Sequence, residues 1–290
     1  MIGGYLTQYI HWRAIFWFLT IYGSVLLAVI YLFVPETSRP KQTSKISLPT
    51  LQSEILLSSP PSQKSYNPLA PILLLRYPNI ALVILYKIWV TSTIYVQNIL
   101  IPERFAITYG LTASQIGLVF LAPGFGLMSG SLVGGKLSDY ILSKKMKKCG
   151  GTYIPELRLH SVWFGSILVP LAYFSFGWLL ENGVYIVYPL IAMFLGGFGT
   201  LMAFNPTSTY LVESYPTRSA SVVALNNFMR ALVAGSMSAL AAPLSDAVGI
   251  GWTFTLMASG NVLTMFFLIL VYRNGKKWRE KLHKENSKHF

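Results

Sequence analysis

Charged residues are scarce in this chain, and acidic residues are the scarcest. Only 11% of its 290 residues are charged, and 10 Asp and Glu stand against 23 Lys and Arg. An ordinary soluble protein carries about a quarter of charged residues. Together with 53% hydrophobic residues, this deficit argues against a soluble enzyme, and we expect no enzymatic activity.

Cysteine and clustered histidine are also missing. The single cysteine, Cys149, excludes an internal disulfide and a Cys-cluster metal site, and the four histidines lack ligand spacing. Near matches to nucleotide-binding motifs around Gly130 lie on an apolar stretch with no preceding strand, so a phosphate cradle is not expected. The sequence therefore predicts no metal and no cofactor.

Long hydrophobic runs account for about half of the chain. About 20 apolar residues of helix cross a hydrocarbon core of about 30 Å. Seven runs of roughly that length are present: 14–34, 80–100, 116–135, 162–180, 185–212, 222–243 and 252–272. They predict an all-α, multi-pass integral membrane protein with about seven transmembrane helices.

The basic residues predict how these helices are oriented. When the connections are numbered alternately, 19 Lys and Arg fall on one side, two on the other, and Lys87 and Arg230 lie within runs. Basic loops stay on the cytosolic side, which places the C-terminus inside. The net charge of +13 is then a topology signal beside anionic lipid, and no nucleic acid is needed as a partner. The expected partner is the lipid bilayer.

Short motifs at both ends of the first long run have a recognisable order. Residues 1–6 (MIGGYL) precede 12–17 (WRAIFW), and 35–39 (PETSR) follow the run. The sequence continues with 134–140 (GGKLSDY), 205–210 (NPTSTY), 216–221 (PTRSAS) and 251–255 (GWTFT). Taken together, these motifs resemble the fungal drug:proton antiporters of the major facilitator superfamily, which have twelve spans.

This resemblance implies a fragment that starts late in the fifth span and that we expect to be transport-deficient alone. The implied fold is the C-terminal six-helix half of a major facilitator protein plus one preceding span. The implied parts are a remnant of the fifth span with an outer loop (1–13), the sixth-span equivalent (14–34), a proline-rich cytosolic linker (35–79), a six-helix bundle (80–272) and a basic cytosolic tail (273–290).

The resemblance also implies a conformational-lock motif. It consists of Gly135, Asp139, Lys144 and Lys145, and it departs from the family pattern at 142–143, where Leu-Ser replaces an expected Gly-Arg. A carboxylate at this position can cap an opposing helix N-terminus. By resemblance, Asp139 is expected to dock near 221–226, while the lysines alone are also typical of a solvated, orientation-setting run.

Polar residues inside a span are costly, so they are the leads to a substrate path. Lys87, Thr91, Tyr95 and Asn98 follow one helical face. They predict a cavity wall, although Lys87 could instead extend its ammonium toward water at the cytosolic end. The other candidates are Asn205, Thr209 and Tyr210 beside Pro206, and Asn226, Asn227 and Arg230 in the next run. An inward-facing Arg230 serves either a substrate or the carbonyls of a neighbouring helix, and the residues near Pro206 either line a path or flank a simple kink.

Gly126, Gly130 and Gly134 recur every four residues. Small residues at this spacing let two helices approach closely, so these glycines predict a helix-packing face.

Three hypotheses for function follow. The first is multidrug export by proton antiport, with a small-molecule substrate bound between the two halves of the carrier. None of the acidic residues is central in a run, so the sequence leaves proton coupling as a possibility that rests on the resemblance. The second is export of an endogenous metabolite such as a polyamine or organic acid, and Lys87 and Arg230 favour an anion. The third is a non-transporting membrane protein that associates through its glycine face. The plasma membrane is the expected location, with a vacuolar or other internal membrane as the alternative.

Overall fold

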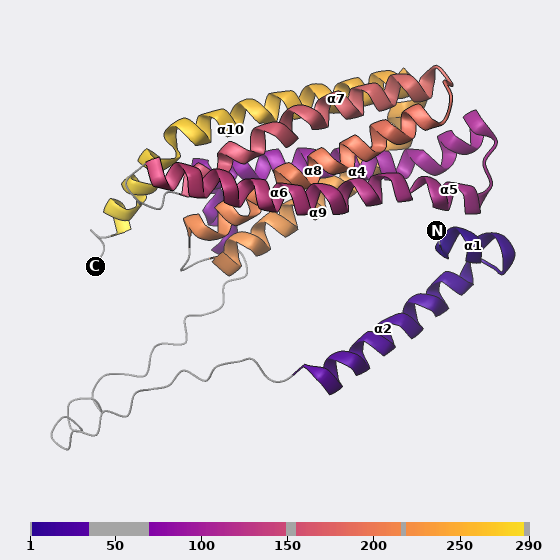
Figure 1. Ribbon diagram of the computed structural model, residues 1–290, viewed down its shortest axis with the longest axis horizontal. Coiled ribbons are helices and arrows are strands. Elements are labelled where there is room, and N and C mark those ends of the chain that lie inside the picture. Colours follow the sequence, from indigo (N-terminus) through magenta and orange to yellow (C-terminus); the bar gives the residue numbers. More distant parts are fainter. Residues whose placement is uncertain (1, 35–69, 149–154, 216–218, 287–290) are drawn as a thin grey trace.

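The computed structural model describes residues 2–34, 70–148, 155–215 and 219–286, and this part of the chain is helical with no strands (Figure 1). Two short 3₁₀ helices, η1 and η2, accompany the α-helices. The elements are α1 (Ile2–Tyr9), α2 (Arg13–Phe33), η1 (Ala70–Arg76), α4 (Pro78–Tyr109), α5 (Ala113–Val119), α6 (Leu121–Lys148), η2 (Pro155–Ser161), α7 (Val162–Glu181), α8 (Val187–Ser214), α9 (Ser219–Val248) and α10 (Ile250–Asn286).

Seven helical stretches within the described residues are long and apolar enough to cross a membrane, which confirms the predicted all-α membrane fold. The hydrophobic runs located the spans but underestimated their lengths. The run predicted at 80–100 is part of α4, which continues through Glu103 and Arg104 to Tyr109. A helix ends where its backbone hydrogen bonds end, whereas a hydrophobic run ends at the first charge. Similarly, the run at 116–135 is divided between α5 and α6.

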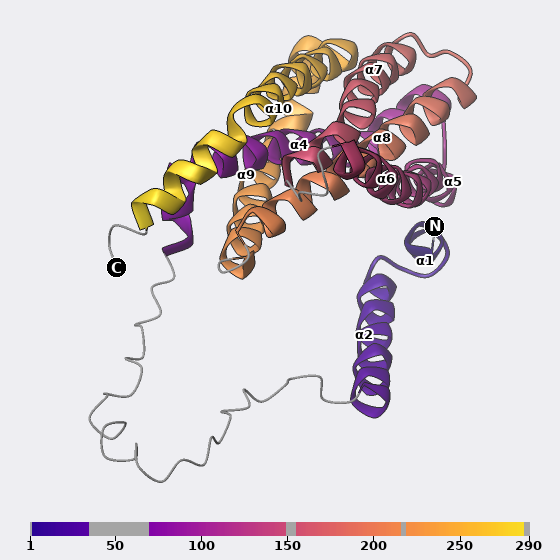
Figure 2. The same ribbon diagram turned by 60° about the vertical axis from the view of Figure 1, so that its left-hand side comes forward.

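Six long helices form one bundle. Helix α8 packs against both α6 and α7, α10 packs against α7 and α4, and α4 packs against α9. Figures 1 and 2 show α4, drawn in violet, running through this group with α9 and α10 beside it. Each of the helices α4, α8 and α9 has a proline in its interior: Pro102, Pro206 and Pro243. Helix α4 thus has α9, α10 and α8 as neighbours, so its polar residues can contact side chains of more than one helix.

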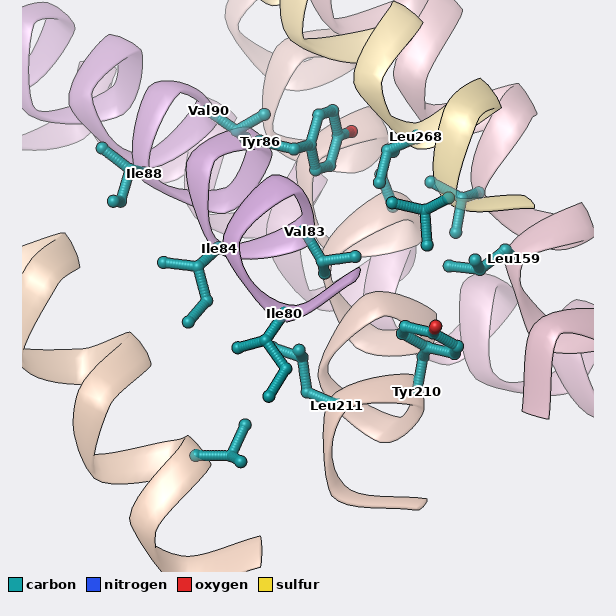
Figure 3. Packing of buried hydrophobic residues seen from close by; sticks show 14 of the residues in the cluster. Ile80, Val83, Ile84, Tyr86, Ile88, Val90, Leu159, Tyr210, Leu211 and Leu268 are labelled. Carbon is teal, nitrogen blue, oxygen red and sulfur yellow. The ribbon is translucent and has the colours of Figure 1, made fainter. Parts of the chain in front are cut away.

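Two groups of buried apolar side chains hold the bundle together. The first surrounds the start of α4, where Ile80, Ile84 and Tyr86 meet Tyr210 of α8 and Leu268 of α10 (Figure 3). The second surrounds the end of α4 and includes Leu100, Phe105, Phe176 and Phe254. Because lipid is as apolar as these side chains, close van der Waals packing is the main stabilising force between helices in a membrane.

Helix α2 lies apart from the bundle in both views (Figures 1 and 2). None of its residues is buried, although its side chains are almost all apolar. Helix α1, which leads into it, packs against α5, and the Gln8 side chain accepts hydrogen bonds from Ser114. An apolar helix with every face uncovered is suited to contact with lipid or with other helices.

The segment expected to be a linker, 35–79, lies outside the described residues as far as residue 69. Its end is helical: Ala70–Arg76 form η1, where Leu74 is buried against the bundle. The connection between α9 and α10 is a single residue. Gly249 alone separates the two helices, and its φ is +86°. A non-glycine residue would be strained there.

Candidate functional site

Lys87 is the most deeply buried charge among the described residues. It lies on α4, and only 2% of its surface is exposed. Its Nζ donates a hydrogen bond of 2.6 Å to Ser208 Oγ on α8 and lies 4.0 Å from the centre of the Phe204 ring, one turn earlier on the same helix. The Ser208 hydroxyl in turn donates to the Phe204 carbonyl. Lys87 is thus turned into the bundle rather than toward its surface.

Arg230 approaches the same ring from α9. Its guanidinium carbon lies 5.4 Å from the Phe204 ring centre, and one of its nitrogens donates to Asn227 Oδ1 at 3.5 Å. Asn226 donates to the same oxygen at 3.3 Å. Three helices therefore meet at one aromatic ring. We call Lys87, Phe204, Ser208 and Arg230 the Phe204 cluster.

The Phe204 cluster has an excess of positive charge. Within the described ranges, the ion pairs join Arg104 to Asp246 and Arg158 to Asp139 and Glu213, and none includes Lys87 or Arg230. Aromatic rings attract cations through their faces, but this attraction is weaker than an ion pair in a dry environment. The arrangement can therefore receive negative charge. The described residues also contain no group of three His, Cys, Asp or Glu that could hold a metal ion.

Two of the other predicted residues of α4, Tyr95 and Asn98, lie too far along the helix to reach this cluster. Thr91 is buried, whereas Tyr95 is 49% exposed and Asn98 is also exposed. Eight to eleven residues separate the last two from Lys87, which corresponds to about 12–17 Å along a helix. Of the polar face predicted on α4, the structure brings Lys87 to the meeting point of the three helices and leaves Tyr95 and Asn98 well beyond it.

The predicted polar residues of α8 serve neighbouring contacts. Asn205 donates a hydrogen bond of 3.0 Å to Ser131 on α6, and the Thr209 hydroxyl returns to the Asn205 carbonyl. Tyr210 is 1% exposed and belongs to the apolar group around the start of α4. The structure thus places Asn205 against α6 and Tyr210 in the core, and the Thr209 hydroxyl bonds within its own helix.

The glycines of α6 face α8. A Cβ at Gly126 or Gly130 would collide with backbone atoms of Phe194 or Phe198, and a Cβ at Gly134 would lie 2.8 Å from Met202 Cα. The backbones of the two helices can be this close only because these positions have no side chain. This glycine face is therefore occupied within the chain.

Asp139 contacts a different element from the one expected. The sequence placed its partner near 221–226 on α9, but α6 packs on α8 and η2. The Asp139 carboxylate accepts a hydrogen bond of 3.2 Å from Arg158 of η2, and Arg158 also donates to Glu213 of α8 at 2.9 Å. In the same motif Lys144 lies 5.9 Å from the Tyr140 ring centre, and Gly135 has open space where a Cβ would be. Lys145 also lies on α6, one residue further on.

Sequence reasoning missed Phe204, Ser208, Arg158 and Glu213. The first two are four residues apart and so share a face of α8, which was the available signal. Phe204 is one of many aromatic residues in an apolar run, and nothing in the local sequence distinguishes it as the ring that two cations approach. Which carboxylates Arg158 contacts depends on how η2 packs against α6 and α8, and the local sequence of η2 does not specify this packing.

Comparison with known proteins gives the family. The family model described as Major Facilitator Superfamily matches residues 1–239. This chain belongs to the major facilitator superfamily. Members of this superfamily are membrane transporters, and the seven long apolar helices agree with that assignment. No solved structure matches this chain.

Several fungal members of the superfamily are similar to the chain. Quinidine resistance protein 3 of Saccharomyces cerevisiae and MFS antiporter QDR3 of Candida albicans are each 32% identical over 215 residues, which cover 73% of this chain and 31% of either relative. Citrate exporter 1 of Aspergillus niger is 30% identical over 319 aligned positions, covering 96% of this chain and 59% of the relative. The chain thus spans about a third to three fifths of the length of these relatives.

Proposed function

We propose that this chain is part of an exporter of small organic molecules that works by alternating access, with the Phe204 cluster on the wall of the substrate path. The observation that carries the proposal is the meeting of Lys87 and Arg230, from α4 and α9, at Phe204 of α8. Ionisable groups inside membrane spans are costly, and they commonly mark a substrate or ion pathway. In transporters such sites lie between packed helices near the middle of the membrane.

Multidrug export by proton antiport is the first specific form of this function. Its support is the ordered set of motifs and the similarity to relatives named for quinidine resistance and antiport. Because we expect the chain alone to be transport-deficient, the test uses a chimera in which this chain replaces the matching part of MFS antiporter QDR3 of Candida albicans, in vesicles with an imposed pH gradient. Efflux of quinidine that follows the gradient supports proton antiport, and efflux that ignores the gradient contradicts it.

Export of an endogenous metabolite is the second specific form. Its support is the similarity to a relative named as a citrate exporter and the positive charge of the Phe204 cluster. The same charge disfavours a polyamine, because a cationic ligand would meet two cations with no carboxylate beside them among the described residues.

The packing of α6 disfavours the hypothesis of a non-transporting interaction protein. That hypothesis required the glycine face of α6 for a partner, but Gly126, Gly130 and Gly134 lie directly against α8. A partner helix would have to displace α8 from the bundle.

We further infer that α4 and α6–α10 correspond to the C-terminal half of the fold and α2 to the span before it. We also infer that the protein lies in the plasma membrane with its C-terminus in the cytosol. The charge distribution supports this orientation. An epitope fused after Phe290 should be inaccessible to antibody in intact cells and accessible after permeabilisation. Staining of intact cells would contradict it.

A ligand panel tests the proposed function on the purified 290-residue protein in detergent. The panel contains quinidine, spermidine, citrate and, as a control, sucrose. We expect at least one of the three organic ions to raise the unfolding temperature, because a ligand that binds the folded state stabilises it. The Phe204→Ala variant should lose most of this shift. If none of the three raises the unfolding temperature, the proposed function is contradicted.

A further inference from the structure

The two cations of the Phe204 cluster are incompletely neutralised by the described residues around them. An ammonium group has three hydrogen-bond donors, and a guanidinium group has five. The Lys87 ammonium donates to one neutral hydroxyl, that of Ser208, and the hydrogen bond from Arg230 to Asn227 has the length at which such bonds become weak. Neither cation has a carboxylate partner in the described ranges.

This arrangement is expensive for the free protein. Burying a charge requires paired charge and well-formed hydrogen bonds, and Lys87 has 2% of its surface exposed. The single ring that both cations approach adds only a modest attraction to each. The two like charges near this ring also repel each other. A bound anion would reduce both the burial cost and the repulsion, whereas a cationic ligand would add to the repulsion.

The positions of the two groups divide the site into an outer and an inner point. Arg230 is half-buried, and its neighbour Asn227 is exposed, so an approaching ligand meets the guanidinium first. Lys87 is the inner point, because only 2% of its surface is exposed and its ammonium donates to Ser208 beside the Phe204 ring. The planar guanidinium suits bidentate binding of one carboxylate, and the ammonium acts as a point charge for a second.

We propose that the Phe204 cluster binds a small organic anion with at least two carboxylates, one held by Arg230 and the other by Lys87. This inference rests on the proposed export function and gives its substrate class. Because only 2% of the Lys87 surface is exposed, the second carboxylate can reach the ammonium only if side chains beside it, such as that of Phe204, shift. Ser208 beside Lys87 and Asn227 beside Arg230 supply neutral hydrogen-bonding groups.

Calorimetric titration of the purified 290-residue protein with acetate, succinate and citrate tests the inference. Succinate and citrate should bind at least about tenfold more tightly than acetate, because acetate can engage one cation only. Lys87→Met and Arg230→Gln should each reduce succinate binding by about tenfold or more, and Arg230→Lys should recover part of the loss because it keeps the charge. Lys136→Gln, at an exposed lysine of α6, is the matched control and should bind like the parent protein.

The outcomes separate the inference from the proposed function. Equal affinity for acetate and succinate, or succinate binding that survives both Lys87→Met and Arg230→Gln, would overturn the inference. If no carboxylate binds but quinidine does, and Phe204→Ala abolishes quinidine binding, the export function stands and the anion class is wrong. If Lys87→Met fails to fold, Arg230→Gln with its Arg230→Lys counterpart still decides between these results.

Discussion

The Lys87 ammonium of α4 donates a hydrogen bond of 2.6 Å to the Ser208 hydroxyl of α8, a residue 121 positions away in the sequence. This bond fixes a buried cation beside the Phe204 ring and ties together two helices that share few other contacts. The pair therefore has a structural role, which measurements of stability can test, beside its proposed role in ligand binding.

Ser208→Ala tests the structural role. The change removes the hydroxyl that Lys87 contacts and leaves a buried donor without that acceptor, so we expect a loss of about 1–3 kcal/mol in the free energy of unfolding. Ser175→Ala is the control, because its hydroxyl bonds only to a carbonyl of its own helix. Thermal unfolding in detergent measures both. A Ser208→Ala protein as stable as Ser175→Ala would show that the bond contributes nothing.

The contact between α6 and α8 predicts opposite effects for two glycine substitutions. Gly130→Ala places a Cβ against the backbone of Phe198, so stability should fall by about 1–3 kcal/mol. Gly124→Ala, on the same helix, meets nothing within 4 Å and should be neutral or stabilising by up to about 1 kcal/mol. Chemical or thermal unfolding of the two variants compares them directly. Equal effects would mean that the helices are not in close contact at Gly130.

The two carboxylates that share Arg158 should contribute unequally. The Asp139 side chain is 73% exposed and that of Glu213 is 24% exposed. Asp139→Asn should cost less than about 1 kcal/mol, as exposed ion pairs do, whereas Glu213→Gln should cost about 1.5–3 kcal/mol. Unfolding temperatures at low and high salt measure the difference. A larger effect at Asp139 would show that this residue forms a contact other than the one to η2.

Glu181 stabilises the start of α10. Its carboxylate accepts a hydrogen bond from the Gly251 backbone N–H, in the first turn of that helix. Negative charge at a helix N-terminus is favourable, so Glu181→Ala should reduce stability by about 0.5–2 kcal/mol. Glu103→Ala, at an exposed glutamate of α4, is the control and should have little effect. Indistinguishable unfolding curves for the two variants would exclude this capping role.

Helix positions were predictable because they depend on local composition. Seven apolar runs were enough to locate seven long helices, and a four-residue repeat was enough to mark Gly126, Gly130 and Gly134 as a face. The partner of that face was not predictable, because nothing in the repeat distinguishes α8 from a helix of another molecule.

The candidate site was predictable only in part. Lys87 and Arg230 stood out because charge is costly inside a span, but their meeting at Phe204 depends on the packing of three helices. Lys87 and Asn98 point to the same side of α4 by helical spacing, yet they lie about 16 Å apart along the helix axis. The polar face predicted from the sequence was therefore longer than the site. The partner of Asp139 was expected from family resemblance and was found on η2 instead.

Site-directed thiol labelling tests most directly whether the Phe204 cluster is where substrate binds. In a Cys149→Ser background, Ala231→Cys places a thiol on α9 next to Arg230, and Ala247→Cys places one near the end of the same helix; both alanines are exposed. A ligand that binds the protein, whether citrate, spermidine or quinidine, should slow maleimide labelling at position 231 several-fold and leave position 247 unchanged. A ligand that binds but leaves labelling at position 231 as fast as before would contradict the account.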